Sequence, residues 1–518
     1  PHDAVRSVKG SVHRIVSAAG TTRVEGSLSG LRRVFAIGTG GVTVGGDRAD
    51  VLAGLTGVAP DPVRVATRLL YPAIPWPVGW QPVWREVGAV LPGHYLTLDS
   101  GETTRWWVPP EPTLSLAGSA EALRAALVDA VRVRLRPGRP VVSHLSGLDS
   151  SSLFSIAVAE GADVLGITAA QPDAMDSDVE WARRTVAALN APHARHEVIP
   201  ADEVPLVYDG ILRAGDRLDE PFGYVHNRER YLGILARGER VAPSAHLMGL
   251  GGDELCAPVP QWLHTLLMRS PATGVRRLRA VAAKNRWAYR DVARNLARGR
   301  SYPGWLRGVA ERLGEPVGVK DPGLGWGVTP VVPAWTTPDA VAAVAAEIAA
   351  AAAAPDSALA ADRGLHRTLE VIYSGAQTMR GFQAIAAGRG ITVAAPFFDD
   401  EVVTAALSAR LDDRVDPARY KPVLVEAMRG IVPAVTLGRT SKSETAATAV
   451  MGSREHRDQL TGLAEDSRLA GLGLVDSEQL SEVVRGPIDI RTPNRRIEPT
   501  IGCEIWLRNE AANVRIGT

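Results

Sequence analysis

The chain is poor in cysteine, in long apolar runs and in net charge, and each shortage excludes a class of protein. Its 518 residues include only two cysteines, Cys256 and Cys503, too few for a disulfide framework, and no Cys-x-x-Cys motif exists for zinc or redox chemistry. No apolar run reaches the roughly 18 residues that a membrane helix needs. The formal net charge of +1 gives no overall field that would favour nucleic acid or a membrane as partner.

The first 14 residues carry several charges and no apolar core, which is not the pattern of a secretory signal peptide. A disulfide between the two cysteines is one alternative, but two buried free thiols in a reducing compartment are the simpler expectation. We therefore expect a cytoplasmic protein.

The pattern of apolar residues divides the chain into two parts. Residues 1–112 read as β-rich, with short apolar runs between glycine turns, and end at a stiff segment with Pro109, Pro110 and Pro112. In residues 113–518, short buried strands alternate with helices at first, as at 140–145, 164–168 and 245–249, which predicts a doubly wound parallel sheet. From about 260 the strand signals stop and helical patterns run to near 470, with a helical insert expected at about 256–365. The expected class is α/β with two domains, 1–112 and 113–518.

The strongest motif follows the first of these buried strands. Residues 144–153 read HLSGLDSSSL, a strand that turns through glycine and serines into a helix. Small residues let the backbone approach a ligand, and the free N–H groups of the helix start suit a phosphate. Ser146, Gly147, Ser150 and Ser151 could thus cradle a pyrophosphate, although an ordinary capped turn is the plain alternative. No Gly-Lys-Ser/Thr follows, so this is not a Walker loop.

A second glycine-rich loop, MGLGGDEL at 248–255, also follows a strand. Ligands of open parallel sheets bind beyond the carboxyl ends of the strands, so we expect the two loops to meet there. Asp149 in the first loop would repel phosphates unless a cation lies between them. Mg²⁺ prefers carboxylate and phosphate oxygens, which predicts one ion held by Asp149 and Asp253, with Gly251 and Gly252 beside the nucleotide.

These motifs resemble those of the asparagine synthetase family. Residues 146–151, SGLDSS, are similar to its Ser-Gly-Gly-Leu-Asp-Ser-Ser PP-loop, with Leu148 in place of the second glycine, and 251–255 are similar to its second acidic loop. Four further segments resemble the family: PGHYL at 92–96, APFFD at 395–399, RYKPVL at 419–424 and RTSK at 439–442. The resemblance implies an N-terminal Ntn-amidotransferase-like domain and a C-terminal PP-loop synthetase domain that uses ATP and Mg²⁺.

A glutaminase domain of that family needs an N-terminal cysteine, and this sequence begins Pro1-His2-Asp3. The resemblance then points to the branch in which the substrate supplies its own amine, and most closely to lasso-peptide cyclases. Such an enzyme is implied to adenylate an Asp or Glu side chain of a precursor peptide. The peptide's N-terminal amine then attacks and closes a macrolactam, with release of AMP and pyrophosphate. A leader-binding protein and a leader peptidase are the further partners that this implies.

The resemblance also assigns roles to residues late in the chain. Lys442 is the candidate to stabilise the oxyanion that develops during acyl transfer, and Lys421 and Arg439 are candidates to neutralise phosphates. Glu370 and Tyr373, three apart on an expected helix, could share a face and act as the base, but an ordinary helix pair explains them as well. His144 is expected to be packed, and the acids Asp178 and Glu180 to favour the start of a helix.

Two other functions stay open. One is a β-lactam-forming or asparagine-type synthetase with a small substrate, and the other is a binding scaffold without catalysis. A peptide enzyme should have a wide cleft and a small-molecule enzyme a tight one. Retention of two acidic loops argues against the scaffold, because an inactive site has no need for two close carboxylates.

Overall fold

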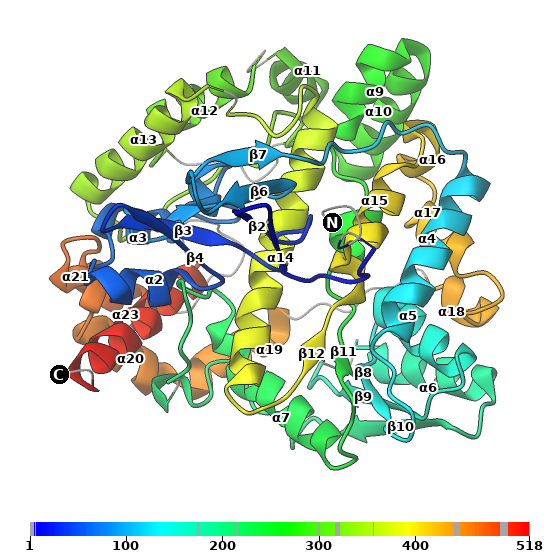
Figure 1. Cartoon of the computed structure of the whole chain (residues 1–518). Helices are drawn as coiled ribbons and strands as arrows, with labels where there is room; N and C mark the ends of the chain where they lie inside the picture. Colours follow the sequence, from blue (N-terminus) through cyan, green and yellow to red (C-terminus); the bar gives the residue numbers. More distant parts are fainter. Residues whose placement is uncertain are drawn as a thin grey trace.

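The computed structural model describes residue 5 and residues 7–173, 176–213, 215–297, 301–315, 322–355, 357–439, 446–486 and 496–516. Its class is mixed α/β, as predicted: antiparallel sheets lie near the N-terminus, and a parallel sheet with many helices follows (Figure 1). Among the described helices, none is both long enough and apolar enough to cross a membrane.

The N-terminal part consists of two small antiparallel sheets. The first has the order β1-β2-β6-β7 and the second β4-β3-β5. Their strands are β1 (Arg14–Ala18), β2 (Thr21–Glu25), β3 (Phe35–Thr39), β4 (Val42–Gly46), β5 (Gly88–Ala89), β6 (His94–Thr97) and β7 (Thr103–Arg105). The helices α2 (Ala49–Thr56) and α3 (Pro62–Thr67) accompany them. The proline-rich stretch between β7 and the next helix has no regular structure beyond one bridge, Leu114 to Ala409.

The second part is built on a five-stranded parallel sheet with the order β10-β9-β8-β11-β12. The strands are β8 (Val141–His144), β9 (Val164–Ala169), β10 (Ala194–Ile199), β11 (His246–Leu247) and β12 (Val393–Ala394). The first strand, β8, lies between the strands that come next along the chain and the strands that come last. The strand order therefore reverses between β8 and β11, and such a switch point is where open α/β sheets bind ligands.

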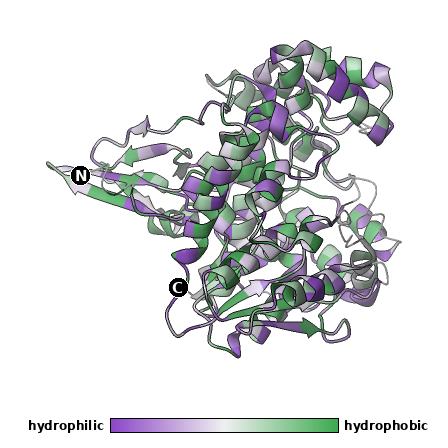
Figure 2. Cartoon of the chain, turned by 90° about the vertical axis from the view of Figure 1, so that its right-hand side faces the viewer, coloured by the Kyte–Doolittle hydropathy of each residue, from purple (hydrophilic) through white to green (hydrophobic). Residues whose placement is uncertain are grey.

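Helices cover both faces of this sheet, as its buried strands require. They include α4 (Leu116–Arg132), α5 (Leu148–Ala159), α6 (Asp178–Leu189) and α7 (Arg228–Glu239). Successive side chains of β8 point to opposite faces: Val141 joins the main core, whereas Val142 packs in a cluster with Ile234 of α7. In Figure 2 the strands of the interior are mostly hydrophobic, while the outer helices also carry hydrophilic residues.

Most of the described residues in the rest of the chain are helical. The predicted insert contains α9 (Trp262–Arg269), α10 (Pro271–Asn285), α11 (Tyr289–Ala297), α12 (Tyr302–Glu311) and α13 (Pro338–Ala353). The long α14 (Arg363–Ala387) follows, and then come α15 (Asp400–Leu407), α16 (Leu411–Arg414), α17 (Pro422–Ala427), α18 (Ala434–Leu437), α19 (Ala446–Glu455), α20 (Arg457–Glu465), α21 (Arg468–Gly471), α22 (Ser477–Arg485) and α23 (Glu498–Ile516). The short β12 was not predicted, since two residues carry no detectable period.

Buried polar contacts join the N-terminal sheets to the second part. Asp399 accepts a hydrogen bond from the backbone of Ser11 at 3.0 Å, and Asp400 accepts from Arg14 at 3.0 Å and from the backbone of Leu28 at 2.8 Å. The segment 395–399 noted in the sequence therefore ends at the contact between the two parts.

Candidate active site

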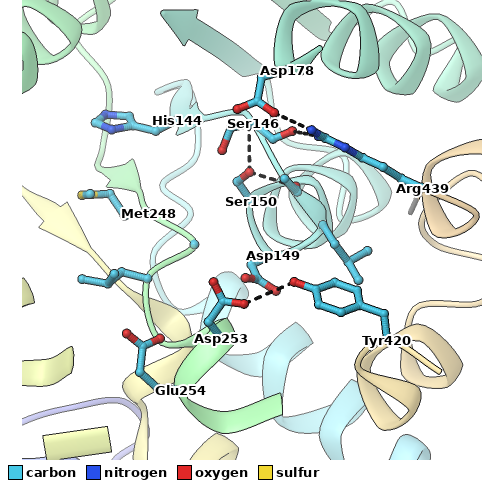
Figure 3. A pocket seen from close by; sticks show the side chains of 14 residues that line it. His144, Ser146, Asp149, Ser150, Asp178, Met248, Asp253, Glu254, Tyr420 and Arg439 are labelled. Carbon is cyan, nitrogen blue, oxygen red and sulfur yellow. Dashed lines mark hydrogen bonds and ion pairs between the residues drawn. The ribbon is translucent and has the colours of Figure 1, made fainter. Parts of the chain in front are cut away.

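A cavity of about 380 Å³ lies beyond the carboxyl ends of β8 and β11. This volume is within the roughly 300–1,000 Å³ that ligand pockets occupy. Its described lining comes from the loop after β8, from the loop after β11 and from single residues of later segments. These residues are His144, Ser146, Gly147, Leu148, Asp149, Ser150, Asp178, Met248, Gly249, Leu250, Asp253, Glu254, Tyr420 and Arg439 (Figure 3).

The first loop is held by its own serine. The Ser150 hydroxyl donates to the Gly147 carbonyl at 3.0 Å and accepts from the Ser146 N–H at 2.9 Å. The Ser146 side chain is exposed at the cavity, whereas Ser151 is buried and is not part of the lining. The start of α5 thus presents Gly147 and Ser150 to a bound anion, as a helix N-terminus can.

The second loop approaches the first so closely that only glycine fits at two of its positions. A Cβ at residue 249 would lie 2.7 Å from the backbone nitrogen of Ser150, and a Cβ at residue 252 would lie 2.3 Å from Cγ of Asp149. Gly251 has φ +102°, a conformation that favours glycine. Gly249 and Gly252 therefore bring the two loops together, whereas Gly251 approaches Phe397 and Phe398. Neither Gly251 nor Gly252 is part of the cavity lining.

Asp149 and Asp253 converge, as the sequence predicted, but in this structure a lysine joins them. The Lys421 ammonium lies 2.6 Å from both carboxylate oxygens of Asp149 and 2.8 Å from Oδ1 of Asp253. The Tyr420 hydroxyl donates to the same Asp253 oxygen at 3.2 Å. Burial alone would lower the pKa of Lys421, but the charges of Asp149 and Asp253 outweigh it and raise that pKa above its ordinary value. Lys421 therefore remains a cation.

The same two carboxylates are suited to a magnesium ion. Mg²⁺ is usually bound by one or two carboxylates together with phosphate oxygens and water. No cluster of three or more His, Cys, Asp or Glu able to hold a metal occurs within the described part of the chain. The donor set of Asp149 and Asp253 therefore fits a magnesium ion whose remaining ligands are water or the phosphates of a nucleotide.

The backbone at Lys421 explains how its side chain reaches this position. Lys421 has φ +41° and ψ +56°, in the left-handed region that residues other than glycine rarely adopt. It precedes α17, and its side chain is fully buried. A strained conformation of this kind persists only where other contacts hold the residue in place. Here the ion pairs of the Lys421 ammonium with Asp149 and Asp253 do so.

Arg439 connects the first loop to α6. It donates to the Ser146 carbonyl at 2.9 Å and to Asp178 at 2.5 Å, and only 6% of its side chain is exposed. Asp178 was predicted to favour a helix start; it does begin α6, and it also lines the cavity and pairs with Arg439. Arg439 thus places a cation at the cavity wall.

Glu370 and Tyr373 lie elsewhere. Glu370 accepts from the backbone of Trp76 at 3.0 Å and pairs with Arg367 at 2.5 Å. The Tyr373 ring packs on Trp76 and Trp80, with centroids 5.6 Å apart in each case. Both are buried and neither is part of the cavity lining. Their contacts are those of a helix that packs on the N-terminal part, so the geometry lends no support to their role as base.

Several residues of the site lie in places that the sequence pattern did not predict. Lys442 lies outside the described residues. His144 was expected to be packed but lines the cavity, as does Glu254, whose pKa is raised by burial and by the neighbouring charge of Asp253. The central place of Lys421 had no local signal beyond its segment's resemblance. Both cysteines are free, as expected, but only Cys503 is fully buried and Cys256 is half-buried. Desolvation of its thiol raises the pKa of Cys256 to about 12.

Comparison with known proteins adds one finding. A family model described as asparagine synthase matches residues 122–508, well over half of the chain. The comparison with curated proteins gives no match.

Proposed function

The chain belongs to the asparagine synthase family, and on that premise we propose that it adenylates a carboxylate of a precursor peptide and closes a macrolactam with the peptide's own amine, as lasso-peptide cyclases do. Family members are ATP-dependent amide-forming synthetases, so the chain is an ATP-dependent amide-bond ligase. The finer proposal is that AMP and pyrophosphate are released and that the substrate is a peptide.

The observation that carries the proposal is the convergence of Asp149, Asp253 and Lys421 at the switch point. A triphosphate that lies over the start of α5 would meet the N–H groups of the first loop, with Lys421 and Arg439 as the nearby cations. Asp149 and Asp253 would hold the magnesium, which supplies charge neutralisation of the departing pyrophosphate. Adenylation requires that the charge of the departing pyrophosphate be neutralised, and these acids and cations together can supply that neutralisation.

The rest of the cavity favours a peptide over a free amino acid. Leu148, Met248 and Leu250 make part of its wall apolar. Arg439, the cation described in the cavity lining, is already paired with Asp178. Lys421, buried behind the lining, is paired with Asp149 and Asp253. A small zwitterionic substrate would need a further cation for its α-carboxylate. A peptide side chain and terminal amine impose no such requirement.

In this mechanism the peptide carboxylate attacks the α-phosphorus, and the pyrophosphate bond to that phosphorus breaks. The amine then adds to the acyl carbon and AMP leaves. We retain Lys442 as the proposed donor to the oxyanion. An α-amine has a pKa of about 7.7–8.0, so part of it is already neutral at pH 7 and ready to attack.

The test is ATP–pyrophosphate exchange with candidate precursor peptides, together with mass spectrometry of the product. Asp149→Ala should abolish exchange, because the magnesium that neutralises the pyrophosphate would lose one of its two protein ligands. Lys442→Ala should retain exchange and lose at least tenfold in ring closure. Equal exchange by the wild type and Asp149→Ala would refute adenylation at this site. Exchange with free amino acids and none with peptides would favour the small-substrate synthetase instead.

A further inference from the structure

Two histidines and a glutamate form a chain of hydrogen bonds from the surface to the cavity. Glu239, at the end of α7, has a side chain 41% exposed, and its Oε1 lies 3.0 Å from Nε2 of His246. His246 is fully buried on β11. Its Nδ1 lies 3.2 Å from Nε2 of His144 at the end of β8, and the two rings are perpendicular, with an interplanar angle of 89°.

The surrounding packing holds these rings in place. A Cβ at residue 238 would lie 2.3 Å from Cε1 of His246, so Gly238 makes room for that ring. The Tyr231 ring lies edge-on to His144, with centroids 6.2 Å apart. Both glycine and tyrosine belong to α7, the helix that ends at Glu239. Helix α7 therefore sets the position of each member of the chain.

The direction of the hydrogen bonds follows from the carboxylate. A carboxylate only accepts, so Nε2 of His246 donates to Glu239. Burial lowers the pKa of His246, although Glu239 acts in the opposite direction; a neutral ring carries one proton, so its Nδ1 must accept. His144 then donates through Nε2. Burial, and next the neighbouring His246, lower the pKa of His144 to about 3, so that ring is neutral and its Nδ1 carries no proton.

This leaves a bare ring nitrogen at the cavity. His144 is part of the cavity lining. Its Nδ1 has no hydrogen-bond partner among the described residues. This nitrogen is also not among the buried atoms that lack a partner, so it is not buried. A ring nitrogen with a fixed lone pair binds an N–H donor and repels another acceptor.

We propose that His144 is a specificity-determining residue whose Nδ1 accepts a hydrogen bond from an N–H group of the bound ligand, with His246 and Glu239 as positioning residues that fix its tautomer. This inference rests on the proposed function, because the two ligands that could supply the N–H group are substrates of that reaction. One is the 6-amino group of adenine, and the other is the amine that attacks the adenylate.

The experiment reads the tautomer directly. In full-length protein labelled with ¹⁵N-histidine, the His144 resonances are assigned by their loss in His144→Phe. We expect an unprotonated Nδ1 and a protonated Nε2. The protein is then titrated with Mg·ATP, with Mg·purine riboside triphosphate, which lacks the 6-amino group, and with glycinamide after saturation with Mg·ATP.

The response of Nδ1 to the three ligands distinguishes the two donors. A shift of Nδ1 with ATP but not with the purine analogue identifies adenine as the donor, and His144→Phe should then bind both nucleotides with equal affinity. A shift with glycinamide alone identifies the amine. A protonated Nδ1, or an unprotonated Nδ1 that moves with none of the three ligands, overturns the proposal. Because no turnover is needed, loss of pyrophosphate exchange with a normal Nδ1 response would contradict the proposed function and leave this inference intact.

Glu239→Leu tests the positioning residues. It should mix the two tautomers of His144 and weaken the binding of the responsive ligand at least threefold. Its control is Glu203→Leu, because Glu203 also pairs with α7, through Arg237, and is half-exposed, yet lies outside the chain of hydrogen bonds. An unchanged His144 tautomer in Glu239→Leu would exclude the role of Glu239.

Discussion

At the scale of single residues, the junction of Asp149, Lys421 and Asp253 governs the site. Asp149 has only 17% of its side chain exposed and Lys421 has none. Either charge would therefore destabilise the folded protein if it had no partner of opposite charge. The lysine therefore neutralises the same carboxylates that suit a magnesium. A nucleotide that brings magnesium would place a second cation beside them, and the ammonium is then available to the phosphates.

Lys421→Met should destabilise the protein in the absence of metal. Removal of one partner from a buried pair costs roughly 3–5 kcal/mol, and the low end is expected because 48% of the Asp253 side chain is exposed. Denaturant unfolding in EDTA and in millimolar Mg²⁺ would measure it. Magnesium should restore part of the loss in the variant and change the wild type little.

The matched control is Arg429→Met, because Arg429 also pairs with a carboxylate, Glu426, at 2.9 Å, but is 63% exposed. Its loss should cost no more than about 0.5 kcal/mol. If magnesium stabilised Lys421→Met no more than the wild type, the carboxylates would not be the metal's ligands.

At the scale of elements, the site depends on two strand–loop–helix units in contact. The first runs from β8 into α5, and the second from β11 into α8 (Gly252–Cys256). Each unit is local in sequence, but the contact between them requires that no side chain intervene at residues 249 and 252.

Gly252→Ala should therefore slow pyrophosphate exchange at least tenfold. Its Cβ would overlap Asp149 Cγ and displace the carboxylate from Lys421 and from any metal. Gly462→Ala, on the exposed face of α20 with no atom near the added methyl, should keep full exchange and add about 0.5–1 kcal/mol of stability. Normal exchange in Gly252→Ala would show that the loop contact is dispensable.

At the scale of the whole molecule, the contact between the N-terminal sheets and the parallel-sheet part contains a titratable group. Burial raises the pKa of Asp400 to about 7, against the opposing effects of the Leu28 N–H and Arg14. The folded protein thus binds a proton that the unfolded chain has already lost at the same pH. Between the ordinary pKa of an aspartate and pH 7, stability must fall as pH rises, and it levels off above 7.

Asp400→Asn should remove this contribution, because an amide does not titrate. The free energy of unfolding of the wild type, relative to the variant, should fall by up to about 1.4 kcal/mol for each pH unit between pH 5 and 7. Urea unfolding at several pH values would measure it, with Asp412→Asn on the exposed surface as the control. The free energy of unfolding of the wild type, relative to Asp400→Asn, could instead stay constant or rise as pH rises. Either result would show that Asp400 is ionised in the folded protein throughout this pH range.

The sequence by itself determined the α/β class and the two acidic loops, because their signals are local. Apolar runs such as 141–144 and 164–169 identify buried strands, and glycine and carboxylate follow directly where a strand ends. The helix start predicted at Asp178 and Glu180 is the start of α6. The division at residue 112 and the identity of the substrate stay predictions.

Only the tertiary structure decided which groups meet. Lys421 is 272 residues from Asp149 along the chain, and no periodicity links them. The direction in which α14 presents Glu370 and Tyr373 depends on Trp76 and Trp80 in another part of the chain. His144 was indistinguishable from a packed strand residue until β11 placed His246 beside it. Contacts of this kind depend on packing between distant segments, whereas strands and loops follow from the order of neighbouring residues.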